Sequence, residues 1–146
     1  MTDPAARQLL ATAAGLLDMG HAIDRLSRPL TILAFAGLLA PLIVPVPLAG
    51  VAALLLAGLA GLGTAYMGAR VALDAALFRG HATGTDDFAL LDGALMQLGL
   101  LAAHKAGRPL TDRLAGAQHL LRRQALLLVV QVAALLAAGI AGLSAS

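Results

Sequence analysis

Uncharged runs separated by short charged segments are the dominant pattern of this chain. Residues 29–69 contain no Asp, Glu, Lys, Arg or His. A membrane-spanning helix needs about 20 residues, so this run is long enough for two helices. Pro45 and Pro47 interrupt it, because proline removes a backbone donor and disfavours helix in the residue before it. The pattern predicts a transmembrane helical hairpin, with a first span at 29–44, a tight turn, and a second span after it.

The two ends of the chain extend this pattern. Residues 124–146 lack ionisable side chains and are long enough for a third span with a short C-terminal tail. In residues 1–28, Pro4 suits the first position of a helix. Apolar residues then recur every three to four positions, as in an amphipathic helix. Ser27 is interpreted as a helix cap before Pro29, where that helix meets the first span.

Residues 70–123 carry the other charged side chains and are predicted to form a cytoplasmic helical region. Thr85 suits the cap of a helix within this region, and a final helix starts near its end. That helix leads toward the third span, and the sequence leaves open whether one helix is continuous over 110–143. The predicted fold is an all-α integral membrane protein, with three transmembrane helices plus amphipathic cytoplasmic helices.

Composition supports a lipid-embedded chain. The sequence is 60% hydrophobic and 12% charged, and the charged share is about half that of soluble domains. Arginine far outnumbers lysine and there is no glutamate, a bias that indicates a GC-rich bacterial genome. The formal charge of +2 comes from few bases, which are interleaved with aspartates. Nucleic acid is therefore not an expected partner, because aromatic residues that stack on bases are also scarce.

The charges also predict an orientation. All ten Lys and Arg residues lie before residue 29 or between residues 70 and 123. Basic residues remain on the cytoplasmic side, so we expect a multi-pass protein of the bacterial inner membrane with a cytoplasmic N-terminus and a periplasmic C-terminus. Arg70 marks the cytoplasmic boundary of the second span, where Tyr66 suits the interface. Asp74 lies four residues further along the same helix and can pair with Arg70.

Small residues recur every four positions in two of the spans and predict helix-packing interfaces. Lipid gives no hydrophobic reward for helix association, so ridges of this kind usually face another helix. Gln131 should face protein as well, because an amide in lipid lacks hydrogen-bond partners. The two ridges pack either on each other or on another subunit, and the sequence leaves both open. The interface positions are Ala53, Ala57, Gly61, Ala65 and Ala69 in the first ridge, and Gln131, Ala134, Ala138 and Gly142 in the second.

No pattern of reactive residues indicates an enzyme. The histidines lie in four different segments, Cys and Glu are missing, and no phosphate-binding or nucleophile motif occurs. No catalytic, cofactor-binding or metal site is therefore predicted. A juxtamembrane polar cluster is expected at the cytoplasmic edge, where Asp92 pairs with Arg113 or His119. The members of this cluster are Arg70, Asp74, Asp92, Arg113 and His119.

The expected function is that of a small non-enzymatic accessory, assembly or stabilising subunit of a larger membrane complex. Its expected partners are membrane lipid and either other membrane-protein subunits or further copies of itself. The alternative is a homo-oligomeric pore or a carrier, since the small size and the three spans resemble the architecture of holins. Against a pore, Thr64 and Gln131 are the only polar residues in the middle of the predicted spans.

Overall fold

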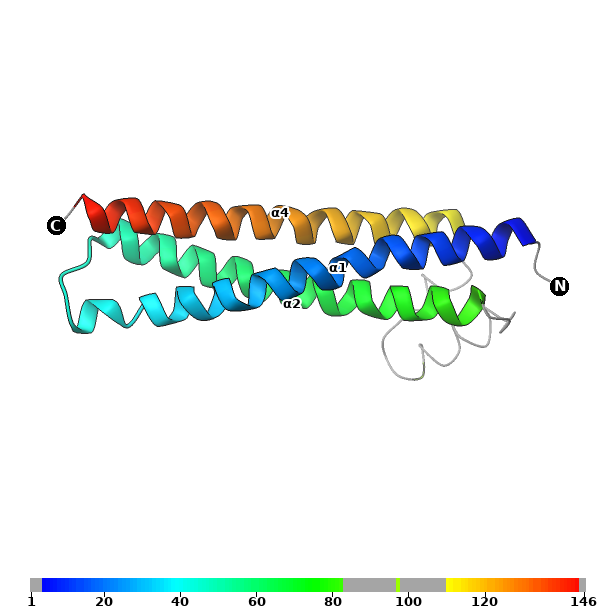
Figure 1. The fold of residues 1–146 in the computed structure, drawn as a ribbon, viewed down its shortest axis with the longest axis horizontal. Coiled ribbons are helices and arrows are strands. Elements are labelled where there is room, and N and C mark those ends of the chain that lie inside the picture. Colours follow the sequence, from blue (N-terminus) through cyan, green and yellow to red (C-terminus); the bar gives the residue numbers. More distant parts are fainter. Residues whose placement is uncertain (1–3, 83–96, 98–109, 145–146) are drawn as a thin grey trace.

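Three long helices form the described part of the chain, residues 4–82, 97 and 110–144 of the computed structural model. Helix α1 spans Pro4–Gly37, α2 spans Leu48–Ala82 and α4 spans Leu110–Leu143, and a short 3-10 helix, η1, covers Ala40–Leu42. Figure 1 shows α1 and α4 running in one direction and α2 running in the other. The two ends of the chain therefore lie at opposite ends of an elongated bundle.

Two of the described helices are long and apolar enough to cross a membrane, α2 over Leu48–Ala76 and α4 over Leu114–Leu143. Helix α4 runs without a break from residue 110 to residue 143, which answers the question that the sequence left open. At 1.5 Å per residue it is about 50 Å long, so part of it extends beyond a hydrocarbon core of about 30 Å. Of the helix predicted after Thr85, only Gln97 is among the described residues, and it is helical.

Helix α1 differs from the predicted boundary before Pro29. It continues through this proline and ends at Gly37, so the helix boundaries predicted at residues 29 and 44 are wrong. The physical reason is Pro41, which has no N–H to donate to the carbonyl of Gly37. The N–H of Leu39 donates to the carbonyl of Ala36, three residues back, and the N–H groups of Leu42 and Ile43 after the proline do the same with Leu39 and Ala40. Residues 38–47 then form a connection built around η1.

The three helices pack through positions spaced seven residues apart, which is the repeat of left-handed coiled coils. All of these positions are buried except the last one on α4, which is half-buried. They are Gly20, Ser27 and Ala34 on α1, Ala57, Thr64 and Val71 on α2, and Ala117, Gln124, Gln131 and Ala138 on α4.

Apolar clusters lie on both sides of a polar middle in this bundle. One cluster includes Leu17, Val71 and Ala117, near the N-terminal end of α1. The other consists of Ala34, Ala57 and Ala134, one small residue from each helix. Between the two clusters lie the buried polar side chains of Ser27, Thr64, Gln124 and Gln131.

Candidate functional site

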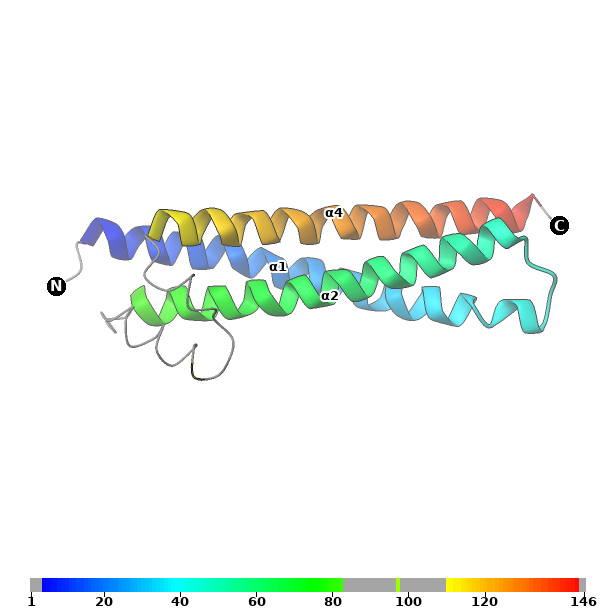
Figure 2. The ribbon, with the colours of Figure 1, turned by 180° about the vertical axis from the view of Figure 1, so that it is seen from behind.

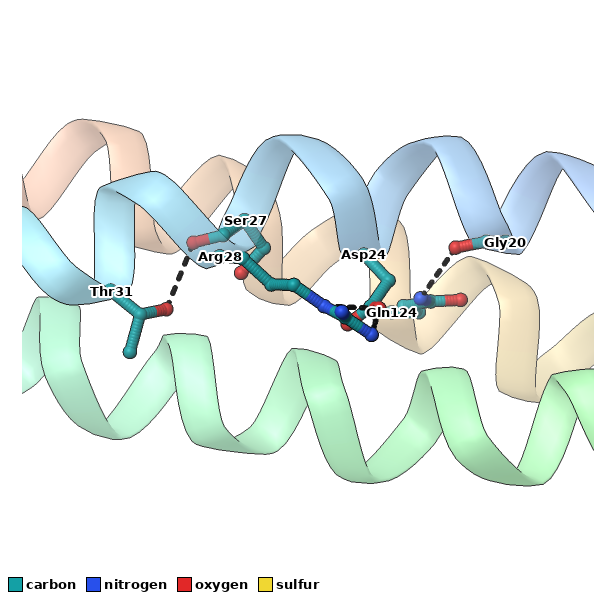
Figure 3. A network of polar contacts seen from close by, with 6 residues as sticks. All are labelled: Gly20, Asp24, Ser27, Arg28, Thr31 and Gln124. Carbon is teal, nitrogen blue, oxygen red and sulfur yellow. Dashed lines mark hydrogen bonds and ion pairs between the residues drawn. The ribbon is translucent and has the colours of Figure 1, made fainter.

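Gln131 of α4 is the centre of a hydrogen-bond network that joins α4 to α1. Its side chain is buried, with 0% of its surface exposed. The Ser27 hydroxyl donates to Oε1 over 2.6 Å, and Nε2 donates to the Thr31 hydroxyl over 2.9 Å and to the Ser27 carbonyl over 3.3 Å. The Thr31 hydroxyl donates to the same carbonyl over 2.9 Å (Figure 3). Both N–H groups of the amide and its oxygen therefore have partners.

Gly61 of α2 leaves the room that this network occupies. A Cβ at this position would meet the Thr31 hydroxyl and would lie 2.6 Å from Nε2 of Gln131. Real Cβ atoms essentially never approach a neighbour closer than 3.0 Å. Glycine therefore allows α2 to come close to both other helices, and Thr31, Gly61 and Gln131 lie at one level of the bundle.

A second amide, Gln124, lies seven residues before Gln131 and is also fully buried. Its Nε2 donates to the carbonyl of Gly20 over 2.9 Å (Figure 3). A Cβ at Gly20 would lie 3.0 Å from its Oε1, and a Cβ at Gly68 would lie 2.8 Å from its Nε2. Two glycines thus make the space for this amide. Its Oε1 has no hydrogen-bond donor among the described residues.

Replacing Gln124 with Met is expected to change the stability of the bundle by less than about 1 kcal/mol. The substitution keeps the length of the side chain and removes a buried acceptor that no described donor satisfies, which stabilises the bundle, but it also removes the hydrogen bond from Nε2 to the Gly20 carbonyl, which offsets this gain. Thermal unfolding of the purified chain in detergent, followed by circular dichroism, measures the change. A loss well above about 1 kcal/mol would mean that Oε1, as well as Nε2, has a hydrogen-bond partner.

Asp24 and Arg28 form an ion pair on α1 beside this network. Nη2 and Nε of Arg28 lie 2.6 Å and 2.9 Å from Oδ2 of Asp24, whose side chain is 14% exposed against 74% for Arg28. A Cβ at Gly68 would lie 3.5 Å from Cβ of Asp24, and Gly68 is two residues from Arg70 on α2. Arg28 is four residues beyond Asp24 in the opposite direction, so it lies roughly 9 Å along the bundle from Arg70. At that depth the surface is mostly apolar, and the pairing with Asp24 balances the charge of Arg28.

These contacts can hold helices in register. Ser27, Thr31, Gly61, Gln124 and Gln131 are called the polar clamp below. Its amides and hydroxyls donate and accept hydrogen bonds without ionising at neutral pH. Within residues 4–82 and 110–144, no group of three or more His, Asp or Glu could hold a metal ion. The chemistry of the clamp therefore favours a structural role between helices.

The first predicted ridge lies partly inside the bundle. Ala57 and Gly61 are buried, Ala53 is half-buried, and Ala65 and Ala69 are exposed. A step of four residues turns about 40° beyond a full turn, because 3.6 residues make one turn of an α-helix. A ridge with that spacing rotates off the packed face, so its second half lies on the outer surface of α2.

The second predicted ridge, on α4, becomes less covered toward the C-terminus. Gln131 and Ala134 are buried, Ala138 is half-buried and Gly142 is exposed. Figures 1 and 2 show that α1 and α4 lie side by side near the N-terminal end of α1 and separate toward η1. A Cβ at Gly139 or Gly142 would have no described neighbour within 4 Å. This end of the ridge is open to contact from another molecule.

The predicted juxtamembrane cluster is described at three of its five positions. Arg70 is exposed and Asp74 is half-buried on α2, and His119 is exposed on α4. Asp92 and the side chain of Arg113 lie outside the described residues. The pairing of Asp92 with Arg113 or His119 therefore stays a prediction.

Reasoning from the sequence missed Ser27 and Gln124 as parts of the site. The interpretation of Ser27 as a helix cap is wrong, because this residue lies inside α1 and its buried hydroxyl binds Gln131. Pro29 is tolerated two residues later, since side-chain hydroxyls and neighbouring helices satisfy the backbone groups that a proline frees. The spacing of seven between Gln124 and Gln131 was the available signal, because it puts both amides on one face of α4.

Comparison of the chain with protein-family models, with curated proteins and with solved structures finds no match. The contacts of the polar clamp and the surfaces around it are therefore the basis for a functional proposal.

Proposed function

We propose that the chain is a small non-enzymatic membrane protein that acts as an accessory, assembly or stabilising subunit of a larger membrane complex. In this proposal α2, α4 and the C-terminal part of α1 cross the bacterial inner membrane. The polar clamp holds the three helices together, and the outer surface binds helices of partner subunits. The observation that carries the proposal is the open end of α4 at Gly139 and Gly142.

The exposed surface of α4 supports a protein partner. Within the most apolar window of each span, 33% of α2 but only 11% of α4 is buried inside the bundle. Large exposed side chains such as Leu126, Leu136 and Ile140 suit lipid. Gly139 and Gly142 do not, because glycine costs about 1 kcal/mol relative to alanine inside a helix. Glycine in a membrane helix is useful where another backbone approaches closely.

The surface of α1 supports a third span. Arg28 is the last charged residue before the connection to α2, and Ile32, Leu33 and Phe35 beyond it are exposed. Ala34 shares a buried cluster with α2 and α4, so this part of α1 lies at the depth of the two apolar spans. With a cytoplasmic N-terminus and a periplasmic C-terminus, all Lys and Arg residues stay on the cytoplasmic side.

A photo-cross-linking residue at Gly139 is expected to form a discrete adduct with a different protein in native membranes. Gly139 has the space to accept the larger side chain. Ala133 is the matched control, because it is another small exposed position of α4. We expect no discrete adduct from it, since it lies on the face that carries Leu126, Leu136 and Ile140. Gels of the cross-linked membranes, followed by mass spectrometry of the adduct, give the result.

Two outcomes would count against this proposal. Adducts of equal yield from Gly139 and Ala133 would show no preferred contact surface. An adduct that contains only a second copy of the chain would favour the homo-oligomeric pore or carrier.

A further inference from the structure

Three exposed arginines of α2 and α4 lie at one level of the bundle. Gly68 of α2 faces Gln124 of α4. Arg70 is two residues beyond this glycine, and Arg122 and Arg123 directly precede the glutamine. The three side chains therefore lie within about one helical turn of one another along the bundle. We call Arg70, Arg122 and Arg123 the basic edge, because Arg70 and Arg123 border the uncharged parts of their helices and Arg122 directly precedes Arg123.

The basic edge carries exposed positive charge, whereas the described carboxylates nearest to it are partly covered. Asp112 is exposed, but it lies ten residues before Arg122, about 15 Å away along α4. Asp24 is bound by Arg28, and Asp18 and Asp74 are half-buried. The arginines of the basic edge are all exposed, and none of them makes an ion pair with a described residue. An anion that approaches this surface would therefore meet exposed guanidinium donors.

Tyr66 holds one of these guanidinium groups in place. The guanidinium carbon of Arg70 lies 5.3 Å from the centre of the Tyr66 ring, a cation–π arrangement. The ring itself is 56% exposed, as expected for tyrosine at a membrane interface. Within the next two turns away from the basic edge, Leu62 on α2 and Leu126 and Val129 on α4 are exposed apolar side chains. Charged donors and an apolar surface thus adjoin each other, as the two parts of a phospholipid require.

We propose that Tyr66 and the basic edge bind the headgroup phosphate of an anionic phospholipid. The planar guanidinium fork matches two phosphate oxygens, and the acyl chains lie along the apolar surface of α2 and α4. Each arginine near an anionic lipid surface is expected to contribute about a fivefold gain in affinity. This inference rests on the proposed membrane location of the bundle.

Native mass spectrometry of the full chain in non-ionic detergent tests the inference. The protein is mixed with equal amounts of phosphatidylglycerol and phosphatidylcholine, and the retained lipid is identified. We expect retention of phosphatidylglycerol, with about a fivefold loss for each of Arg70→Gln, Arg122→Gln and Arg123→Gln. Arg28→Gln is the matched control, because its guanidinium is already bound to Asp24. Circular dichroism of every variant checks that its helices are intact.

Equal retention of the two lipids would overturn the inference, and so would an equal loss in Arg28→Gln. Displacement of the lipid by inorganic phosphate would contradict the inference and indicate a site for the free ion. Retention of an acidic partner protein in place of lipid would also contradict it and indicate a protein interface. Alkaline carbonate extraction tests the membrane location separately. Release of the chain from membranes would contradict the proposed function, whereas a chain that stays embedded without lipid preference would contradict this inference alone.

Discussion

Substitution of Gly61 by Leu is expected to destabilise the bundle by about 3 kcal/mol or more. The new side chain would have to enter the space of the Thr31 hydroxyl and of Nε2 of Gln131, at a level where all three helices meet. Overpacking costs about 1 to 3 kcal/mol, and each lost hydrogen bond of the clamp adds about 1 kcal/mol. The higher helix propensity of leucine offsets less than about 1 kcal/mol of this loss. Thermal unfolding of the purified chain in detergent measures the effect.

Gly116→Ala is the matched control for this substitution. A Cβ at Gly116 would have no described neighbour within 4 Å, and the residue is exposed on α4. We expect a gain of about 0.5 to 1 kcal/mol, because alanine is the better helix former. If Gly61→Leu unfolded at the same temperature as the parent chain, the close approach of α2 to the clamp would be contradicted.

Replacing Gln131 with Ala is expected to cost about 2 kcal/mol. The change leaves a cavity and removes the partner of the buried Ser27 hydroxyl, which then has only backbone carbonyls of its own helix as acceptors. The Thr31 hydroxyl also loses the hydrogen bond that it accepts from Nε2 of Gln131. Gln118→Ala serves as the control, because this glutamine on the same helix is exposed, and a change within about 0.5 kcal/mol is expected there.

A double-mutant cycle between Ser27→Ala and Gln131→Ala separates the hydrogen bond from the cavity. The coupling energy is expected at about 0.6 to 1.7 kcal/mol, the range of hydrogen bonds between membrane helices. Purely additive effects of the two substitutions would mean that the bond of 2.6 Å does not stabilise the contact between α1 and α4.

Much of the helical architecture could be predicted from local features of the sequence. Uncharged runs of about 20 residues or more indicate spans, and α2 and α4 contain two of the three that were predicted. Pro4 is the first residue of α1, and α2 begins directly after Pro47. These features depend on residues close to one another in the chain, so sequence patterns report them well.

The polar clamp depends on contacts between distant residues, and this is why it could not be predicted. Ser27 and Gln131 are 104 positions apart. Their pairing follows from the register of α1 against α4, which no local pattern reports. The continuation of α1 through Pro29 has the same origin. The ridges were placed with a spacing of four, whereas helices that wrap around one another pack with a spacing of seven, so Ala65 and Ala69 lie outside the packed face.

The mass and composition of the assembly extracted from its native membrane test the central claim most directly. The chain would carry a tag at its N-terminus, be extracted in a mild detergent, and be analysed by native mass measurement with identification of every co-purifying protein. The accessory-subunit account predicts a complex that contains other subunits in fixed stoichiometry, and loss of those subunits when Gly139 is replaced by Leu. A chain that is extracted alone, or only with copies of itself, would contradict the account.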